Sequence, residues 1–156
     1  MSGGQLTIHP AQTADAADIL AIKMLAFAEE GRLSGTMEIP PLQEDQASVE
    51  SDIRSHTVLI ARVGGQTVGS ARGMVSGESC EVRAVCVHPS YHGRGIGGAL
   101  MRAIEQAHLE VSRFELTTNT LVPGNVEFYE RRGYQVVSQT RLTETVLLAH
   151  LAKTRT

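Results

Sequence analysis

A run of glycines between two apolar segments is the densest chemical signal in the sequence. Residues 87–98 read VHPSYHGRGIGG, with glycine at positions 93, 95, 97 and 98. Glycine lets the backbone turn tightly and present consecutive N–H groups outward. The apolar spacing after this run predicts a helix, whose positive end would reinforce those N–H groups. A loop of this kind binds phosphate oxygens, and Arg94 could add a positive charge.

The same letters fit another phosphate-binding pattern. Residues 93–98 satisfy G-x-G-x-x-G, the dinucleotide fingerprint, and Glu115 lies at a distance suited to a ribose-binding acid. In that fingerprint the glycines open directly from a strand and begin a βαβ unit. Here five residues, including Pro89, separate the strand from Gly93, and three strands in hairpin order come first. These features disfavour a nicotinamide or flavin site, and a tight turn without a ligand is the third alternative.

The segments that must position this loop alternate between strand and helix patterns. Period-2 alternation predicts strands over residues 5–10, 57–63, 66–75, 80–87, 114–118, 134–140 and 145–152. Helical spacing predicts helices from an N-cap at Thr13 to Glu30, over 43–55, from Gly95 to Val111, and over 124–132, with a loop at 31–42. This order describes an α+β fold, one sheet flanked by helices, rather than a string of βαβ units.

Size and cysteine spacing agree with one folded domain over residues 1–156. Hydrophobic residues make up 42% of the chain and charged residues 20%, which is ordinary for a globular protein with its own core. Cys80 and Cys86 lie on one expected strand, about 20 Å apart at about 3.3 Å per residue, too far for a disulfide. We expect both to be free thiols that pack in the core.

Charge and hydropathy bear on partners and location. The net charge is −3 and no block of like charges occurs, whereas a nucleic-acid-binding protein usually carries a basic stripe. No apolar run approaches the roughly 18 residues of a membrane span, and MSGGQLTIHP lacks the pattern of a signal peptide. His88 and His92 do not have metal-ligand spacing on a helix. We therefore expect a cytoplasmic protein that binds no nucleic acid, membrane or metal.

Two motifs resemble those of a known family. Residues 81–100, EVRAVCVHPSYHGRGIGGAL, resemble the signature of the GNAT superfamily of acetyl-CoA-dependent N-acyltransferases: a strand, V-x-P, then Arg or Gln-x-x-G-x-G or A. Residues 125–134, NVEFYERRGY, resemble its second motif, a helix that ends in a tyrosine and a glycine–aromatic pair. The resemblance spans the chain from Leu6 to about Lys153. It implies a GNAT-type mixed, mostly antiparallel twisted sheet of about seven strands with about four helices, splayed between the strand ending at Val87 and the strand over 114–118.

This resemblance also implies how the coenzyme is held. Acetyl-CoA would be the acetyl donor, with its phosphates on the glycine loop and its pantetheine arm in the splayed gap. A backbone N–H near Val85 or Val87 would polarise the thioester carbonyl. The implied coenzyme-binding residues are Val85, Cys86, Val87, His92, Gly93, Arg94, Gly95, Ile96, Gly97, Gly98, Asn125 and Tyr129.

Two positions depart from the family pattern. His92 stands where the family usually has Arg or Gln, and Val122 occupies a position often filled by asparagine. Asn125, four residues before Tyr129, follows a shorter variant of the second motif. The backbone contribution of the loop is expected to survive the first departure.

The resemblance makes Tyr129 the general acid that protonates the leaving sulfur. An unperturbed phenol has a pKa of about 10 and a thiol about 8.5, so that the phenol is protonated at neutral pH and can share its proton. The alternative role for Phe128 and Tyr129 is an aromatic pair that packs their helix on the sheet.

Glu81 matches the glutamate that some family members use to take the amine proton. Side-chain alternation places Glu81, Arg83, Val85 and Val87 on one side of their strand. A carboxylate paired with Arg83 is the alternative. Glu38 and Glu44 are other candidates for the base.

These motifs together predict an N-acetyltransferase that moves an acetyl group from acetyl-CoA to a primary amine of a small molecule or peptide, by direct attack in a ternary complex. The alternative is a non-catalytic acyl-CoA-binding regulatory module. Residues 31–55 and the last hairpin would set the amine. A homodimer, common in the family, stays open.

Overall fold

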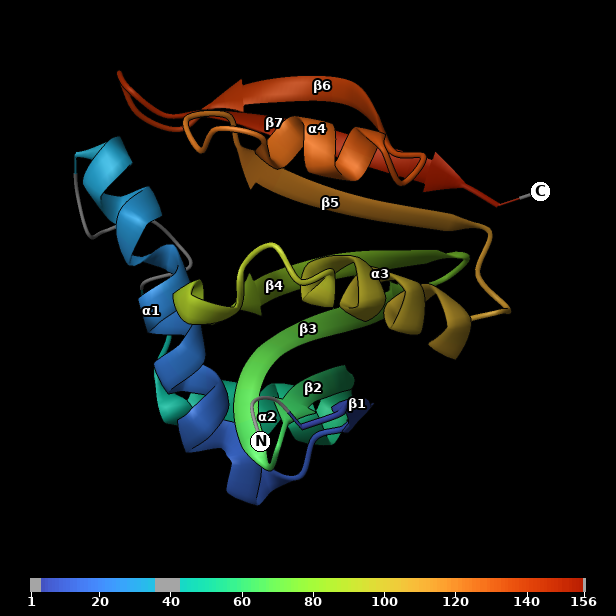
Figure 1. Ribbon diagram of the computed structural model, residues 1–156. Helices are drawn as coiled ribbons and strands as arrows, with labels where there is room; N and C mark the ends of the chain where they lie inside the picture. Colours follow the sequence, from blue (N-terminus) through green and yellow to red (C-terminus); the bar gives the residue numbers. More distant parts are fainter. Residues whose placement is uncertain (1–3, 36–42, 156) are drawn as a thin grey trace.

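The computed structural model describes residues 4–35 and 43–155. The elements follow in the predicted order: β1 Leu6–Pro10, α1 Ala16–Ser34, α2 Gln46–Ser55, β2 Thr57–Val63, β3 Gln66–Ser76, β4 Ser79–Val87, α3 Ile96–Ala107, β5 Arg113–Asn119, α4 Asn125–Glu130, β6 Gln135–Arg141 and β7 Leu147–Thr154. Short 3-10 turns at Thr13–Asp15 and Pro89–Tyr91 precede α1 and α3. The predicted α+β fold is confirmed (Figure 1).

The strands form one sheet in the order β1-β2-β3-β4-β5-β7-β6. Every neighbouring pair is antiparallel except β4 and β5, which run parallel and pair only between Ser79–Glu81 and Arg113–Glu115. Beyond these residues the two strands diverge, and Figure 1 shows the sheet as two leaves that separate toward the carboxyl ends of β4 and β5. The predicted splay is therefore confirmed.

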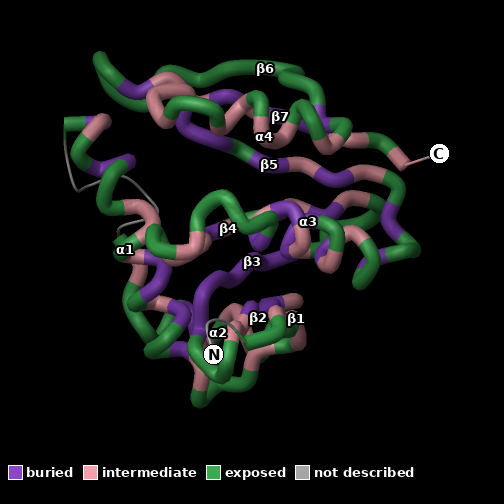
Figure 2. The backbone as a smooth tube through the Cα atoms, viewed as in Figure 1, coloured by how far each residue is buried: buried purple, intermediate pink, exposed green. Residues whose placement is uncertain are grey.

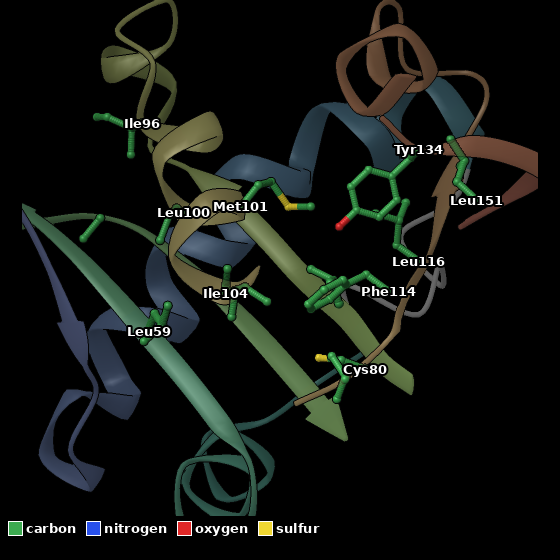
Figure 3. Packing of buried hydrophobic residues seen from close by; sticks show 14 of the residues in the cluster. Leu59, Cys80, Ile96, Leu100, Met101, Ile104, Phe114, Leu116, Tyr134 and Leu151 are labelled. Carbon is green, nitrogen blue, oxygen red and sulfur yellow. The ribbon is translucent and has the colours of Figure 1, made fainter. Parts of the chain in front are cut away.

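Helices cover both faces of the sheet, as Figures 1 and 2 show. On one face α3 buries Ile96, Leu100, Met101 and Ile104 against β2, β3 and β4. The same cluster continues to Phe114 and Leu116 of β5 and to Tyr134 and Leu151, so that one core holds the two leaves together (Figure 3). Full burial of each large apolar side chain stabilises the fold by about 1.5–3 kcal/mol.

On the other face α1 and α2 pack on β2 through a smaller cluster of buried residues: Ala16, Ile19, Val49, Val58 and Ile60.

Several predicted boundaries are wrong. The helix expected from residue 43 begins at Gln46, where the Asp45 side chain accepts a hydrogen bond from Ser48 N and caps it. The helix expected to end at Glu30 continues to Ser34, because Gly35 with φ 76° supplies the left-handed cap that stops it. Thr13 is not an N-cap, since it opens the 3-10 turn whose cap is Gln12. Helix α3 ends at Ala107, and Val111 is buried from the turn that follows.

Cys80 and Cys86 are buried free thiols, as predicted. Burial raises the pKa of Cys80 to about 11 and that of Cys86 to about 12, so that both are uncharged at neutral pH. Among the described residues no helix has the length and apolarity to cross a membrane.

Candidate active site

A cleft of about 1230 Å³ lies where β4 and β5 diverge. Its walls come from the end of β4, the end of β5, the glycine loop, α1 and α4. It brings together Glu81, Val87, the loop glycines, Asn125 and Tyr129, which are distant in sequence. Glu115, the ribose-binding candidate of the dinucleotide interpretation, is not on the cleft wall and is bound by Arg113 Nε at 2.6 Å.

The glycine loop has the conformation of an anion cradle. Gly93 and Gly95 have φ values of 77° and 78°, in the left-handed region, and Gly95 is the N-cap of α3. Ala99 donates its N–H to Gly95 O, but the N–H groups of 93–98 have no acceptor within the described chain. A run of free N–H groups at the positive end of a helix suits phosphate oxygens. The predicted phosphate site thus fits the local geometry.

Gly97 and Gly98 have an additional role that sequence reasoning missed. A Cβ at position 97 would lie 3.2 Å from Phe128 Cζ, and one at position 98 would lie 2.5 Å from Arg132 Nη2. These two glycines therefore let α4 and the residues after it approach the first turn of α3.

The polar side chains of the loop point to local partners. His92 Nε2 lies 3.1 Å from the carbonyl oxygen of Val87, and the guanidinium of Arg94 lies over the Tyr91 ring at 4.7 Å. Both side chains are exposed. An anion bound by the loop would therefore contact mainly its backbone N–H groups, and the exposed Arg94 would lie at the edge of the site.

A bulge in β4 changes which residues share a face. Ala84 has φ 53°, and the register shifts because Cys86 pairs with Ser70 while Arg83 pairs with Arg72. Glu81 and Arg83 therefore lie on the face of α1 and α2, whereas Val85 and Val87 pack into the α3 core. The prediction that these four side chains share one side is wrong, since the bulge reverses the alternation.

Tyr129 combines packing with a free hydroxyl. Its ring makes edge contacts with Phe128 at 4.9 Å and Tyr134 at 6.1 Å between centroids. No hydrogen bond from its hydroxyl to another described residue is found. Burial raises the pKa of Tyr129, which keeps the phenol protonated at neutral pH.

Tyr134 shows the contrasting case. It is 1% exposed, and its hydroxyl donates to Glu105 Oε2 at 2.8 Å, while Lys153 Nζ binds Glu105 Oε1 at 2.9 Å. This hydroxyl is occupied in the core, so that of this tyrosine pair only Tyr129 offers a free proton donor to the cleft.

The candidates for the base differ in their surroundings. Glu81 is partly exposed and accepts a bond of 2.8 Å from Arg83 Nη2, so its role as base stays a prediction. Glu44 is held by Lys23 Nζ at 2.8 Å and by Arg72 Nη1 and Nη2, each at 2.7 Å. Burial opposes its ionisation, but Arg72 and Lys23 lower the pKa of Glu44 to about 2, too low for a base at neutral pH. Glu38 lies outside the described residues.

The Glu44 cluster predicts acid sensitivity. A carboxyl whose pKa falls from 4.5 to about 2 on folding adds stability above pH 4.5 that is lost as the pH falls toward 2. That shift corresponds to about 3 kcal/mol. We expect Glu44→Gln to be less stable than wild type at pH 7 by about this amount, with the difference in stability narrowing between pH 4.5 and 2. Urea unfolding at several pH values measures it, and a gap independent of pH would contradict the prediction.

Two residues of the cleft were not foreseen as site residues. Arg132 lies with its guanidinium 3.8 Å from the centre of the Phe128 ring and donates Nη1 to Phe128 O at 2.7 Å. Arg132 follows the end of α4 at Glu130, and its i,i+4 spacing from Phe128 was the available signal. Burial and the nearby Arg131 and Arg102 lower the pKa of Arg132.

The other unforeseen residue is Glu30, which accepts a bond of 3.3 Å from Asn119 Nδ2. Asn125, a predicted coenzyme contact, lies on the cleft wall and donates Nδ2 to Thr118 Oγ1 at 2.9 Å.

Known proteins resemble this chain in sequence. The family model described as acetyltransferase (GNAT) domain matches residues 54–136, more than half of the chain. The uncharacterized N-acetyltransferase YjcF of Bacillus subtilis is 25% identical over 124 residues, covering 78% of this chain and 79% of the relative.

Solved structures share the fold at low identity. The ribosomal-protein-S18-alanine N-acetyltransferase of Escherichia coli has a TM-score of 0.80 and 16% identity, covering 96% of this chain and 94% of that one. YncA of Salmonella typhimurium, a putative acetyltransferase solved with its cofactor acetyl-CoA, has a TM-score of 0.75 and 18% identity over 97% and 94% of the two chains. With the match over 54–136, which includes β4, the glycine loop and α4, the chain belongs to the GNAT acetyltransferase family.

Proposed function

We propose that this protein transfers the acetyl group of acetyl-CoA to a primary amine of a small molecule or peptide. The observation that carries the proposal is the free Tyr129 hydroxyl on the same cleft as the unpaired N–H groups of 93–98. Membership of an acetyltransferase family makes acetyl-CoA the expected donor. The relatives named for N-acetyl transfer support an amine as the acceptor.

The residues of the cleft fit the parts of the coenzyme. The N–H groups of 93–98 and the positive end of α3 would hold phosphates. The edge of β4 from Val85 to Val87, which has no partner in β5, would pair with the amides of the pantetheine arm. Arg132 has a buried Nε without a partner among the described residues and lines the cleft near α3, where it would face negative charge. When bound, acetyl-CoA supplies an activated thioester.

The reaction then requires two proton transfers, one to the leaving sulfur and one from the attacking amine. Tyr129 would give its hydroxyl proton to the sulfur as the bond from carbon to sulfur breaks. A carboxylate would take the proton that the amine loses, and Glu81 is the candidate by resemblance. The direct reaction needs amine and coenzyme in the cleft together.

Coenzyme binding should be visible as added stability. At 100 times the dissociation constant, acetyl-CoA should stabilise the fold by about 2.7 kcal/mol, which corresponds to roughly 5–10 °C in Tm for a domain of this size. NAD should cause no shift, because the glycines do not open a βαβ unit. Differential scanning fluorimetry measures both, and the absence of a shift at millimolar acetyl-CoA would contradict the proposal.

An amine panel separates an enzyme from an acyl-CoA-binding module. Both bind the coenzyme, but only the enzyme releases coenzyme A thiol in proportion to added amine. Thiol detection with polyamines, amino acids, peptide N-termini and simple alkylamines makes the comparison. Binding without amine-dependent thiol release from any of them would favour the module.

A further inference from the structure

Glu30 is a buried carboxylate on the cleft wall with no part in the chemistry described so far. It lies in the last part of α1, which Figure 1 shows beside the open end of the gap between β4 and β5. The residue is 8% exposed, and Asn119 Nδ2 donates to its Oε2 at 3.3 Å. Asn119 also donates to Ser34 Oγ at 3.0 Å, so that the last residue of β5 fixes this stretch of α1 at the cleft.

The other charged groups on this side of the cleft pair with one another. Arg72 and Lys23 bind Glu44, Arg72 also binds Asp52, and Arg83 binds Glu81. Glu29, the neighbour of Glu30 on α1, pairs with Arg32. No ion pair to Glu30 is found within residues 4–35 and 43–155. A buried carboxylate held by an amide without a cation is costly, and in a concave site it points to a function. An ammonium ion bound in the cleft would supply the positive charge that Glu30 lacks among the described residues.

Glu30 and Tyr129 reach the cleft from two different helices, α1 and α4. The two groups interact electrostatically: burial is the main cause of the raised pKa of Tyr129, and the negative charge of Glu30 adds to the rise. A proton acceptor and a proton donor are therefore within electrostatic range inside one cleft.

We propose that Glu30 is the base that deprotonates the acceptor, and that the acceptor binds as an ammonium ion against this carboxylate. The inference rests on the proposed N-acetyltransferase function. Glu30 takes one proton from the ammonium, which frees the nitrogen lone pair to form the bond to the acetyl carbon. The bond from carbon to sulfur breaks, and sulfur takes the proton of the Tyr129 hydroxyl. Glu30 releases its first proton to water and then takes the second proton from the nitrogen, once the bond to carbon has formed. Of the two protons removed from the nitrogen, one finally replaces that of Tyr129 and one goes to solvent.

The electrostatic surroundings support this role. Burial raises the pKa of Glu30, and the hydrogen bond from Asn119 offsets only part of the rise. A raised pKa makes the Glu30 carboxylate a stronger base and brings its pKa closer to that of an amine. The titratable and charged groups that share the cleft with Glu30 come from several parts of the chain: Lys23 and Glu29 on α1, Glu44 and Asp52 at α2, Arg72 on β3, Glu81, Arg83 and Cys86 on β4, Tyr91 and His92 in the loop before α3, and Tyr129 and Arg132 at and just after α4.

The test is the pH dependence of Glu30→Gln with an amine that the wild type acetylates. Glutamine keeps the size of the side chain and can still bond to Asn119. We expect kcat/KM for the amine to fall by about 10²-fold or more at pH 7. The loss should shrink as the pH rises, because the free amine in solution increases about tenfold per pH unit below its pKa. Affinity for acetyl-CoA, measured by calorimetry, should stay near wild type and shows that the variant is folded.

Two further variants sharpen the result. Asp18→Asn removes one negative charge from an exposed position of the same helix and should leave kcat/KM unchanged. Glu30→Asp keeps a carboxylate and should recover part of the activity that Glu30→Gln loses. If Glu30→Gln does not fold, Glu30→Asp alone should still show an acid limb displaced from that of wild type.

Several results would overturn the inference. Glu30→Gln could keep more than about a third of wild-type kcat/KM at pH 7, or lose activity equally at every pH, as a purely structural residue would. A pH-dependent loss confined to Glu81→Gln would assign the base to β4 instead. A wild type that acetylates no amine overturns the proposed function as well, whereas an active wild type with a normal Glu30→Gln overturns this inference alone.

Discussion

Replacing Tyr129 by phenylalanine is expected to lower kcat by about 10²-fold at neutral pH, with the coenzyme affinity near that of wild type. The phenylalanine ring preserves the edge contacts with Phe128 and Tyr134. Only the hydroxyl is lost, and it has no hydrogen bond to the described residues that would have to be broken. Because a thiolate leaves tolerably well unaided, the loss should sit at the low end of the range for general acid catalysis, about 10²–10⁴-fold.

Tyr134→Phe is the matched control. It removes the hydroxyl that donates to Glu105, a buried bond to a charged group worth about 1.5–3 kcal/mol. This variant should unfold more easily and keep wild-type kcat under conditions where it is folded. Steady-state kinetics and urea unfolding of both variants separate the roles. If Tyr129→Phe keeps more than about a third of wild-type kcat, Tyr129 is a packing residue and water or the substrate delivers the proton.

Gly95→Val is expected to weaken acetyl-CoA binding by about 10²-fold or more without unfolding the domain. Gly95 adopts φ 78°, a conformation that costs an ordinary L-residue roughly 1–2 kcal/mol and a β-branched one more. No atom lies within 4 Å of a Cβ built at this position, so the effect comes from the backbone angle rather than from a clash. Relaxing that angle would turn the free N–H groups of the loop away from a common point.

Gly77→Val provides the comparison. Gly77 has φ 61° in the turn between β3 and β4, a Cβ there also meets nothing within 4 Å, and the residue is not on the cleft wall. It should impose a similar conformational strain with the coenzyme affinity retained. Calorimetric titration of acetyl-CoA into Gly95→Val and Gly77→Val measures the two affinities. Equal affinities would show that the loop is not the phosphate site.

The features set by local chemistry could be predicted from the sequence. Alternation predicted the strands, and the glycines predicted a tight turn, in which Gly93 and Gly95 adopt left-handed angles. The divergence of β4 from β5 came from the family resemblance. Alternation alone does not reveal where two parallel strands stop pairing.

The errors arose where distant contacts decide the structure. The bulge at Ala84 carries no glycine to mark it, and its register becomes visible only against β3. Glu30 lies 89 residues from Asn119 in sequence, and on a helix it looked like any surface carboxylate. In sequence Arg132 cannot be distinguished from its neighbour Arg131. In the structure Gly98 leaves room for the Arg132 guanidinium, which lies on the cleft wall.

The divergence of β4 and β5 also bears on aggregation. A strand edge with free N–H and C=O groups is a template on which strands of other chains can pair. This sheet has two such edges in its interior, beyond Glu81 and Glu115, in addition to its outer edges at β1 and β6. The inner edges lie in a cleft walled by α1, α4 and the loop before α3, where an extended strand with full side chains would meet these helices. The thin, flexible, amide-bearing arm of the proposed coenzyme would fit between these walls, and we expect the same walls to hinder the pairing of a foreign strand.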